Sequence, residues 1–188
     1  MTSPFSLGNL DGTPAGAALS LLAPATASAV VALGWEDRLG VVAIDPALAD
    51  TAALTEASGL PDAVMANCVV VAGARNGVEK VAACVVLADS RADINTPVRK
   101  RLDVRKASFL AMEEAVSRTG MEYGGITPVG LPAEWALYVD SRVVEQPLVV
   151  MGSGVRASKI IAPGALLAEL PGAEVVEGLG RLIAADPA

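Results

Sequence analysis

The chain is most heavily punctuated at Gly120-Met121-Glu122-Tyr123-Gly124-Gly125-Ile126-Thr127-Pro128-Val129-Gly130-Leu131-Pro132, which holds four glycines and two prolines in thirteen residues. This stretch lies between a segment with a helical pattern and one typical of a strand. Glycine lets the backbone reach positive φ and approach a ligand closely, and proline fixes the direction in which the chain leaves. Such a loop either binds a ligand or forms a tight turn without one, and composition alone slightly favours the turn.

Two Val-rich runs precede this loop, at residues 64–72 and 81–88. Their length and Val content predict two buried strands, with a turn between Gly73 and Gly77 that joins them as a hairpin. Asn67 is the odd residue in the first run, because a buried amide without hydrogen-bond partners costs about 1–3 kcal/mol. It either bridges to a neighbouring loop as a structural amide, which is the commoner role, or faces a pocket.

Helix and strand signals place the remaining elements around this hairpin. Pro46 predicts a helix start with Asp45 as its N-cap and Gly59 at its end, and Gly120 predicts the end of the helix before the glycine-rich loop. The other expected elements are short helices within 14–34, strands at 39–44, 136–139, 148–151 and 159–161, and helices at 46–58, 95–102, 109–118 and 163–170. This mixture suits one domain of helices and sheet.

The composition excludes several kinds of chemistry. The chain has no histidine, which removes Ser-His-Asp and Cys-His catalysis and the commonest transition-metal ligand, so we expect neither a metal nor a cofactor. Cys68 and Cys84 lie in apolar runs without a C-x-x-C pair and are typical of buried thiols in a reducing compartment. No apolar run reaches about 18 residues and no basic segment precedes the first Ala/Leu-rich stretch, so we expect a cytoplasmic protein without a membrane helix or secretory signal.

Charge is unevenly distributed along the chain, whose net charge is −7. Residues 64–161 carry twelve Lys and Arg against ten Asp and Glu, a balance of +2, whereas the two flanks carry two against eleven, a balance of −9. The net charge argues against nonspecific nucleic-acid binding by the whole surface. The cluster of Arg99, Lys100, Arg101, Arg105 and Lys106 is either a solvated helix end, the usual meaning of such a run, or a patch that contacts phosphates.

Two further features carry weaker signals. Gly152-Ser153-Gly154, followed by Arg156, either binds a ligand or forms a hairpin turn, and it is not a dinucleotide fingerprint because no helix with a third glycine follows. Asp140 ends an apolar strand, where the common role of a carboxylate is to cap the following turn.

Three of these pieces together resemble the YbaK family, the free-standing relatives of the editing domain of bacterial prolyl-tRNA synthetase. They are residues 124–132, then Tyr138-Val139-Asp140, then Gly152-Ser153-Gly154 with a strand ending before Pro163. The glycine–x–x–x–proline loop from Gly124 to Pro128 is the most specific of them. The resemblance covers about residues 60 to 178 and implies an α+β fold, a single domain with a mixed, curved β-sheet flanked by helices. Residues 1–60 would be an N-terminal extension packed on an editing domain at 61–180.

The resemblance also implies an activity, that of a trans-acting aminoacyl-tRNA deacylase. Such a hydrolase serves translation fidelity by cleaving the ester at the 3′ end of a mischarged tRNA, often of the tRNA-Pro type. The implied partners are mischarged tRNA and an aminoacyl-tRNA synthetase, with no DNA and no membrane. Backbone amides of the glycine loop would stabilise the developing oxyanion, while the substrate's ribose hydroxyl and a backbone carbonyl orient the attacking water.

The site residues that the resemblance implies fall into three groups. The catalytic loop consists of Gly124, Gly125, Ile126, Thr127 and Pro128. Substrate-binding residues are Asn67, Asp140, Gly152, Ser153 and Gly154, and tRNA-binding residues are Arg99, Lys100, Arg101, Lys106, Arg156 and Lys159.

One position departs from the family's pattern. The usual strand reads Ala-Lys-Thr with its lysine in the active site, whereas this chain reads Ala66-Asn67-Cys68, and an amide forms hydrogen bonds without carrying charge. We therefore expect Asn67 to face the pocket, with three alternatives for its chemistry. The protein edits with an amide, another cation substitutes, or a catalytically weak or inactive module binds an aminoacyl ester, nucleotide or synthetase. An unrelated small-molecule enzyme that reuses the pocket is the remaining alternative.

Overall fold

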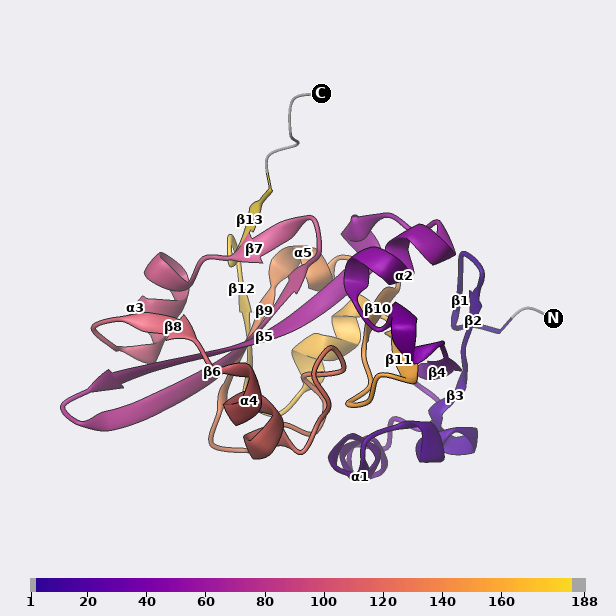
Figure 1. The fold of residues 1–188 in the computed structure, drawn as a ribbon, viewed down its shortest axis with the longest axis horizontal. Coiled ribbons are helices and arrows are strands. Elements are labelled where there is room, and N and C mark those ends of the chain that lie inside the picture. Colours follow the sequence, from indigo (N-terminus) through magenta and orange to yellow (C-terminus); the bar gives the residue numbers. More distant parts are fainter. Residues whose placement is uncertain (1–2, 184–188) are drawn as a thin grey trace.

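The computed structural model describes residues 3–183 as an α+β fold around one large mixed sheet, which confirms the fold class expected from the sequence (Figure 1). The sheet order is β12-β9-β6-β5-β10-β11-β4-β3, and β8 also pairs with β5. The strands are β3 (Thr13–Pro14), β4 (Gly40–Ala43), β5 (Met65–Arg75), β6 (Val78–Leu87), β8 (Ala107–Phe109), β9 (Ala136–Asp140), β10 (Val149–Gly152), β11 (Ser158–Ala162) and β12 (Ala173–Val176).

Strand β5 has two neighbours on one side and one on the other. It runs antiparallel to β6 along its whole length, while its opposite edge pairs with β10 at Met65 and Ala66 and with β8 from Val71 to Gly73. Two short pairs lie outside the large sheet: β1 (Ser6–Leu7) with β2 (Leu10–Asp11), and β7 (Ser90–Ala92) with β13 (Gly180–Leu182). The continuous strand β5 therefore connects the two ends of the molecule.

The β5–β6 hairpin confirms the predicted pair of Val-rich strands, but its turn lies further along the chain than expected. Asn76 and Gly77 form a two-residue turn between the paired residues Arg75 and Val78, with φ of 53° and 79°. Positive φ at both residues favours an Asn-Gly turn, whose twist matches that of the strands. Gly73 thus lies inside β5, where its missing side chain leaves room for Val104 and the backbone at Lys106.

The helices are α1 (Pro24–Ala32), α2 (Thr51–Ser58), α3 (Arg99–Leu102), α4 (Met112–Thr119) and α5 (Ser141–Val144). Gly59 and Gly120 follow α2 and α4 in the left-handed conformation, as their sequence positions predict. The single helix expected at 46–58 is instead two pieces. Asp45 accepts from the N–H of Ala47 and caps a 3-10 turn at Pro46–Leu48, and the chain breaks before α2 begins.

Three other expected helices also differ. The stretch expected to begin a helix at 109 is strand β8, because the free edge of β5 accepts it there, and α4 starts at Met112. The segment expected at 95–102 begins with a π-turn at Ile94–Val98, whose N-cap is Asp93, before α3. The last one is a 3-10 helix at Gly164–Glu169, packed so closely that a Cβ on Gly164 would overlap the carbonyl oxygen of Val143.

The first 60 residues contribute directly to the main sheet. Strand β4 pairs with β11, β3 pairs with β4, and Val30, Trp35 and Leu39 belong to the same buried cluster as residues of β6, β9 and β10. No helix within residues 3–183 has the length and apolarity needed to cross a membrane.

Candidate functional site

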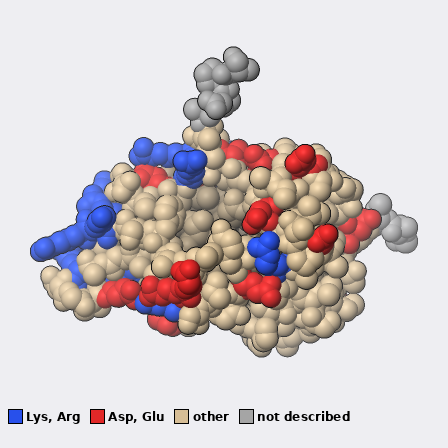
Figure 2. All heavy atoms as spheres, in the orientation of Figure 1, with Lys and Arg blue, Asp and Glu red and all other residues tan. Residues whose placement is uncertain are grey.

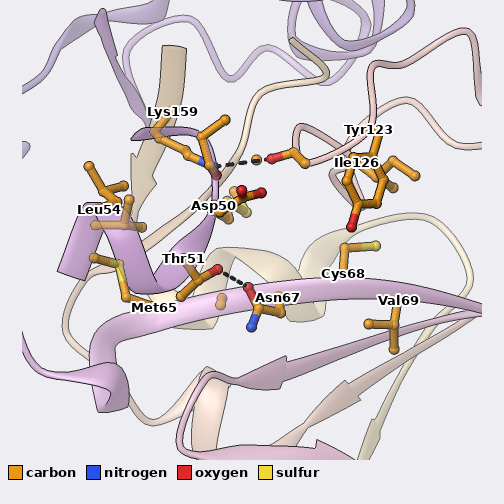
Figure 3. Close-up of a pocket in the computed structure, with 16 residues that line it drawn as sticks. Asp50, Thr51, Leu54, Met65, Asn67, Cys68, Val69, Tyr123, Ile126 and Lys159 are labelled. Atoms are coloured by element: carbon orange, nitrogen blue, oxygen red, sulfur yellow. Dashed lines mark hydrogen bonds between the residues drawn. The ribbon is translucent and has the colours of Figure 1, made fainter. Parts of the chain in front are cut away.

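A cavity of about 290 Å³ lies where β5, β10, β11, the start of α2 and the glycine-rich loop meet (Figure 3). Its lining is mostly apolar, and a few polar groups reach it from different elements, a composition typical of ligand sites. It is formed by residues 49–51 and Leu54, residues 65–69 of β5, Tyr123, Gly124 and Ile126, residues 150–152 of β10, and Lys159 of β11.

Lys159 lies in the wall of this cavity, not on the surface where a phosphate contact was expected. The residue is only 6% exposed because β11 is covered on both sides. Its Nζ donates to the carbonyl oxygen of Ala49 at 2.7 Å and to that of Gly124 at 3.3 Å. The ammonium thus ties the segment before α2 to the glycine-rich loop (Figure 3).

Burial lowers the pKa of Lys159 to about 8, Asp50 counteracts this shift, and Arg156 adds a smaller lowering. The cause is the loss of water around the charged form, which a buried ammonium regains only in part from two carbonyl oxygens. Lys159 is therefore mostly charged at neutral pH but titrates close to it.

Arg156 forms a second tie beside Lys159. Its backbone N–H donates to Glu122 Oε2 at 2.6 Å, its Nη1 to the carbonyl oxygen of Tyr123 at 3.2 Å, and its Nη2 to that of Pro46 at 3.0 Å. Its guanidinium also lies 3.9 Å from Asp50 Oδ1. Two cations that the sequence suggested for phosphate binding thus hold the glycine-rich loop against residues 46–50.

The glycine-rich loop has two backbone N–H groups without a hydrogen-bond partner among residues 3–183. Gly124 has φ of 79°, and a Cβ there would lie 2.8 Å from Arg156 Nη1, so the position requires glycine. The N–H of Gly125 is used in a turn to the carbonyl of Glu122 at 2.9 Å, whereas those of Gly124 and Ile126 donate to no acceptor within residues 3–183. Gly124 and Ile126 are both among the residues that border the cavity.

The two glycine-containing loops interlock at close range. A Cβ on Gly152 would overlap the carbonyl oxygens of Gly125 and Ile126, and a Cβ on Gly125 would lie 2.7 Å from the carbonyl oxygen of Val155. The N–H of Gly154 also donates to the carbonyl of Gly125 at 2.7 Å. The position of the glycine-rich loop is thus fixed by the loop that follows β10.

Asn67 lies in the cavity wall, where the family resemblance, and not its place in the strand, leads us to expect it. Its Oδ1 accepts from Thr51 Oγ1 at 2.7 Å, which leaves the amide N–H groups as its remaining donors (Figure 3). Cys68 borders the same cavity, and burial, with a smaller contribution from Cys84, raises the pKa of its thiol. The thiol is therefore neutral and poorly suited to act as a nucleophile.

Several of the expected site residues lie outside this cavity. Asp140 accepts from the N–H groups of Arg142 and Gly180, so it has the capping role that the sequence offered as the common alternative. Ser153 is fully buried and donates to the carbonyl oxygen of Ser158 at 2.9 Å. Thr127 is also fully buried. Gly154 packs against Ala23 and Thr26, and Pro128 lines a separate apolar cavity behind the loop.

The basic cluster lies at the opposite end of β5 from the cavity. Figure 2 shows Lys and Arg gathered over the end of the molecule that carries α3. We call Arg99, Lys100, Arg101, Arg105 and Lys106 the basic end. Arg101 pairs with Glu174 at 2.7 Å, whereas Lys100, Arg105 and Lys106 are exposed and form no ion pair within residues 3–183.

Sequence reasoning missed the residues that α2 and the loop add to the cavity. Asp50, Thr51 and Leu54 come from a segment assigned to the extension, and nothing in its pattern indicates that the helix breaks beside a ligand site. Tyr123 stands in the quoted loop, but no spacing rule marks it; it is 57% exposed at the cavity's border.

Comparison with known proteins identifies the family. A model of the aminoacyl-tRNA editing domain matches residues 45–170, more than half of the chain, and the protein therefore belongs to that family. The match begins at the 3-10 turn before α2, so the segment that walls the cavity is part of the family domain. None of the curated proteins matches the sequence significantly.

Solved structures share the fold at low sequence identity. The hypothetical protein APE2540 has a TM-score of 0.73 at 21% identity, covering 84% of this chain and 99% of its own. A scaffold used for epitope grafting has a TM-score of 0.69 at 22% identity, over 86% and 97% of the two chains. A proposed trans-editing enzyme for prolyl tRNA synthetase has a TM-score of 0.69 at 21% identity, over 83% and 97%. Family membership supports a deacylase-type editing role and leaves the substrate open.

Proposed function

We propose that this protein is a trans-acting aminoacyl-tRNA deacylase that hydrolyses the ester between an amino acid and the 3′-terminal ribose of mischarged tRNA. The observation that carries the proposal is the glycine-rich loop of an editing-family chain, in which Gly124 and Ile126 border the cavity and their N–H groups lack acceptors within residues 3–183. Two such backbone donors would suit the oxyanion of an acyl-transfer transition state.

The proposed reaction needs no histidine, metal or thiolate from the chain. Water attacks the ester carbonyl carbon, the oxygen of that carbonyl becomes negative between Gly124 and Ile126, and the bond to the ribose oxygen then breaks. Of the two protons of the attacking water, one passes to the ribose oxygen and the other to solvent, so the products are the ribose hydroxyl and the amino-acid carboxylate. The substrate's neighbouring ribose hydroxyl orients the water, and each oxyanion donor contributes a factor of about 10²–10³ to the rate.

The tRNA arm would extend from the cavity to the basic end. Asn67 borders the cavity and Gly73 pairs with Ala107 beside Lys106. The six residue steps along β5 from Asn67 to Gly73 span about 20 Å at about 3.3 Å per step. A nucleic-acid backbone is long enough to contact both places, whereas a free amino-acid ester is not. We assign phosphate contact to Lys100, Arg105 and Lys106, which are exposed and free of ion pairs within residues 3–183.

One observation favours a second function, a module that binds the aminoacyl end, a nucleotide or a synthetase without cleaving it. Asn67 is uncharged and its amide oxygen is held by Thr51 at 2.7 Å. The variant Asn67→Lys restores a cation at this position of β5 and therefore separates the two functions.

The test is deacylation of tRNAs mischarged with Ala, Cys, Ser or Thr, using wild type beside Asn67→Lys. If the protein is a deacylase, the wild type cleaves at least one of these mischarged tRNAs. Cleavage by Asn67→Lys alone would favour the binding module. If neither protein cleaves any substrate while both fold normally by circular dichroism, the deacylase proposal is contradicted for this panel.

A further inference from the structure

The cavity contains one cation whose hydrogen-bonding capacity is incompletely used. Lys159 is the only Lys or Arg among the residues that line it, and an ammonium group has three N–H donors. Two of them reach the carbonyl oxygens of Ala49 and Gly124, at 2.7 and 3.3 Å. The third has no acceptor within residues 3–183, although the group borders the cavity.

Other groups around Lys159 do not satisfy this donor. Asp50 faces it from the start of α2, but its carboxylate is 64% exposed and lies 3.9 Å from Arg156 Nη1. Arg156 follows β10 and is itself a donor. The hydroxyl of Tyr123 accepts no hydrogen bond from Lys159, whose partners within residues 3–183 are the carbonyls of Ala49 and Gly124, and Cys68 borders the cavity from β5 as a neutral thiol. The paired residues on either side of Lys159 are Val42 in β4 and Gly152 in β10, neither of which is charged.

We infer that Lys159 is a substrate-contacting residue, whose remaining N–H donates to an oxygen of the aminoacyl ester or of its terminal ribose. This inference rests on the proposed function for the identity of the ligand. The same ammonium donates to the carbonyl of Gly124, so binding of the ester would occur beside the glycine-rich loop, which borders the cavity. Lys159 then supplies the positive charge that Asn67 lacks.

A bound oxygen acceptor favours the charged form of an amine and raises its pKa. The test uses a stable analogue, 3′-amino-3′-deoxyadenosine carrying alanine in amide linkage, in which no ester can be cleaved. The pKa of Lys159 is followed by NMR at its ε-methylene, without and with the analogue, and the exposed Lys80 serves as the reference. Calorimetry measures the affinity of wild type, Lys159→Met, Lys159→Arg and the control Lys80→Met.

We expect the analogue to raise the pKa of Lys159 and not that of Lys80. Lys159→Met should weaken binding at least about tenfold, as expected for a lost hydrogen bond to a charged group, while Lys159→Arg retains part of it and Lys80→Met has no effect. A rise caused by adenosine alone places the contact on the ribose, and a rise that needs the alanyl group places it on the carbonyl.

The inference is overturned if the analogue binds wild type and Lys159→Met equally, if the pKa of Lys159 is unchanged on binding, or if no binding is detected. These measurements involve no hydrolysis, so they are independent of the deacylation panel. If the protein cleaves no mischarged tRNA but the pKa of Lys159 rises with the analogue, the proposed function is contradicted while this inference is supported.

Discussion

The two ends of β5 use the same kinds of side chain in opposite ways. At the cavity end, Lys159 and Arg156 donate to backbone carbonyls of the glycine-rich loop and of residues 46–49. At the basic end, Lys100, Arg105 and Lys106 face solvent without an ion pair within residues 3–183.

Under the proposed function, this difference separates two kinds of recognition at the two ends of β5. Cations with fixed carbonyl partners position a small reactive group, because their geometry is set before a ligand arrives. Exposed cations attract a phosphate backbone through long-range charge and are screened by salt. Changes at the cavity end should therefore affect turnover, and changes at the basic end should affect tRNA affinity.

Gly124→Ala should have the largest effect. It introduces a Cβ at φ of 79° and 2.8 Å from Arg156 Nη1, so it strains the backbone of the loop and displaces the guanidinium that donates to the carbonyls of Tyr123 and Pro46. We expect kcat to fall by a factor of about 10²–10³, as for the loss of an oxyanion donor. The control is Gly178→Ala, at φ of 69° with no neighbour within 4 Å of the added Cβ, which shares the backbone strain but lies away from the cavity. Equal losses in both variants would assign the effect to strain alone.

The titration of Lys159 should appear in folding stability. Because its pKa is about 8 in the folded protein and near 10.5 when unfolded, only the unfolded chain holds this proton between these pH values. Stability therefore rises with pH across this window. We expect the free energy of unfolding of wild type, relative to Lys159→Met, to rise by about 3 kcal/mol between pH 8 and 10.5. Urea denaturation at several pH values measures this difference, and a flat difference would indicate an ordinary, exposed lysine.

Neutralising the basic end should affect only tRNA substrates. For the double variant Lys100→Gln, Arg105→Gln, we expect KM for mischarged tRNA to rise about tenfold. The number of phosphate contacts calculated from the salt dependence of binding should fall by about two. Cleavage of a 3′-aminoacyl-adenosine, which does not reach the basic end, should stay at the wild-type rate. Arg38→Gln, at an exposed ion pair with Glu169, controls for the loss of one positive charge elsewhere. If KM rises equally in Arg38→Gln, the basic end makes no specific contact with tRNA.

Cys68→Ala should have the smallest effect, a change in amino-acid preference. Cys68 borders the cavity, so its truncation enlarges the site and should favour the next larger aminoacyl group by a factor of several, below about tenfold. Cys84→Ala removes a fully buried thiol that packs in a different cluster and is the matched control. Competition between two mischarged tRNAs measures the ratio, and an unchanged ratio in Cys68→Ala would place specificity elsewhere.

Local signals in the sequence predicted the parts of the fold that depend on local chemistry. The Val-rich runs of β5 and β6 and the left-handed glycines after α2 and α4 follow from residue type and spacing. Strand β8 could not be predicted in this way, because it forms only where the edge of β5 is left open beyond β10. Strands β12 and β13 likewise depend on partners far away in the chain.

The candidate site was predictable where a loop carries its own signature and not where it depends on packing. The glycine-rich loop and Asn67 were identified from sequence, and both border the cavity. Ser153 and Asp140 satisfy backbone groups instead, because short polar side chains near turns bond locally. Lys159 was grouped with surface cations because a lone lysine in a sequence carries no sign of its burial, which arises from β4 and β10 on either side.

The interlocked glycines bear on how this cavity can be redesigned. Since a methyl group on Gly125 or Gly152 would meet backbone atoms of the other loop, mutagenesis of these positions would mostly yield misfolded clones. The positions left for redesign are side chains that border the cavity from α2 and β5, such as Leu54, Met65 and Cys68, of which Leu54 and Met65 also pack in a buried cluster. A combinatorial library confined to these positions would change the shape of the cavity and leave both glycine-containing loops unchanged. Variants with new substrate specificities could then be selected from it.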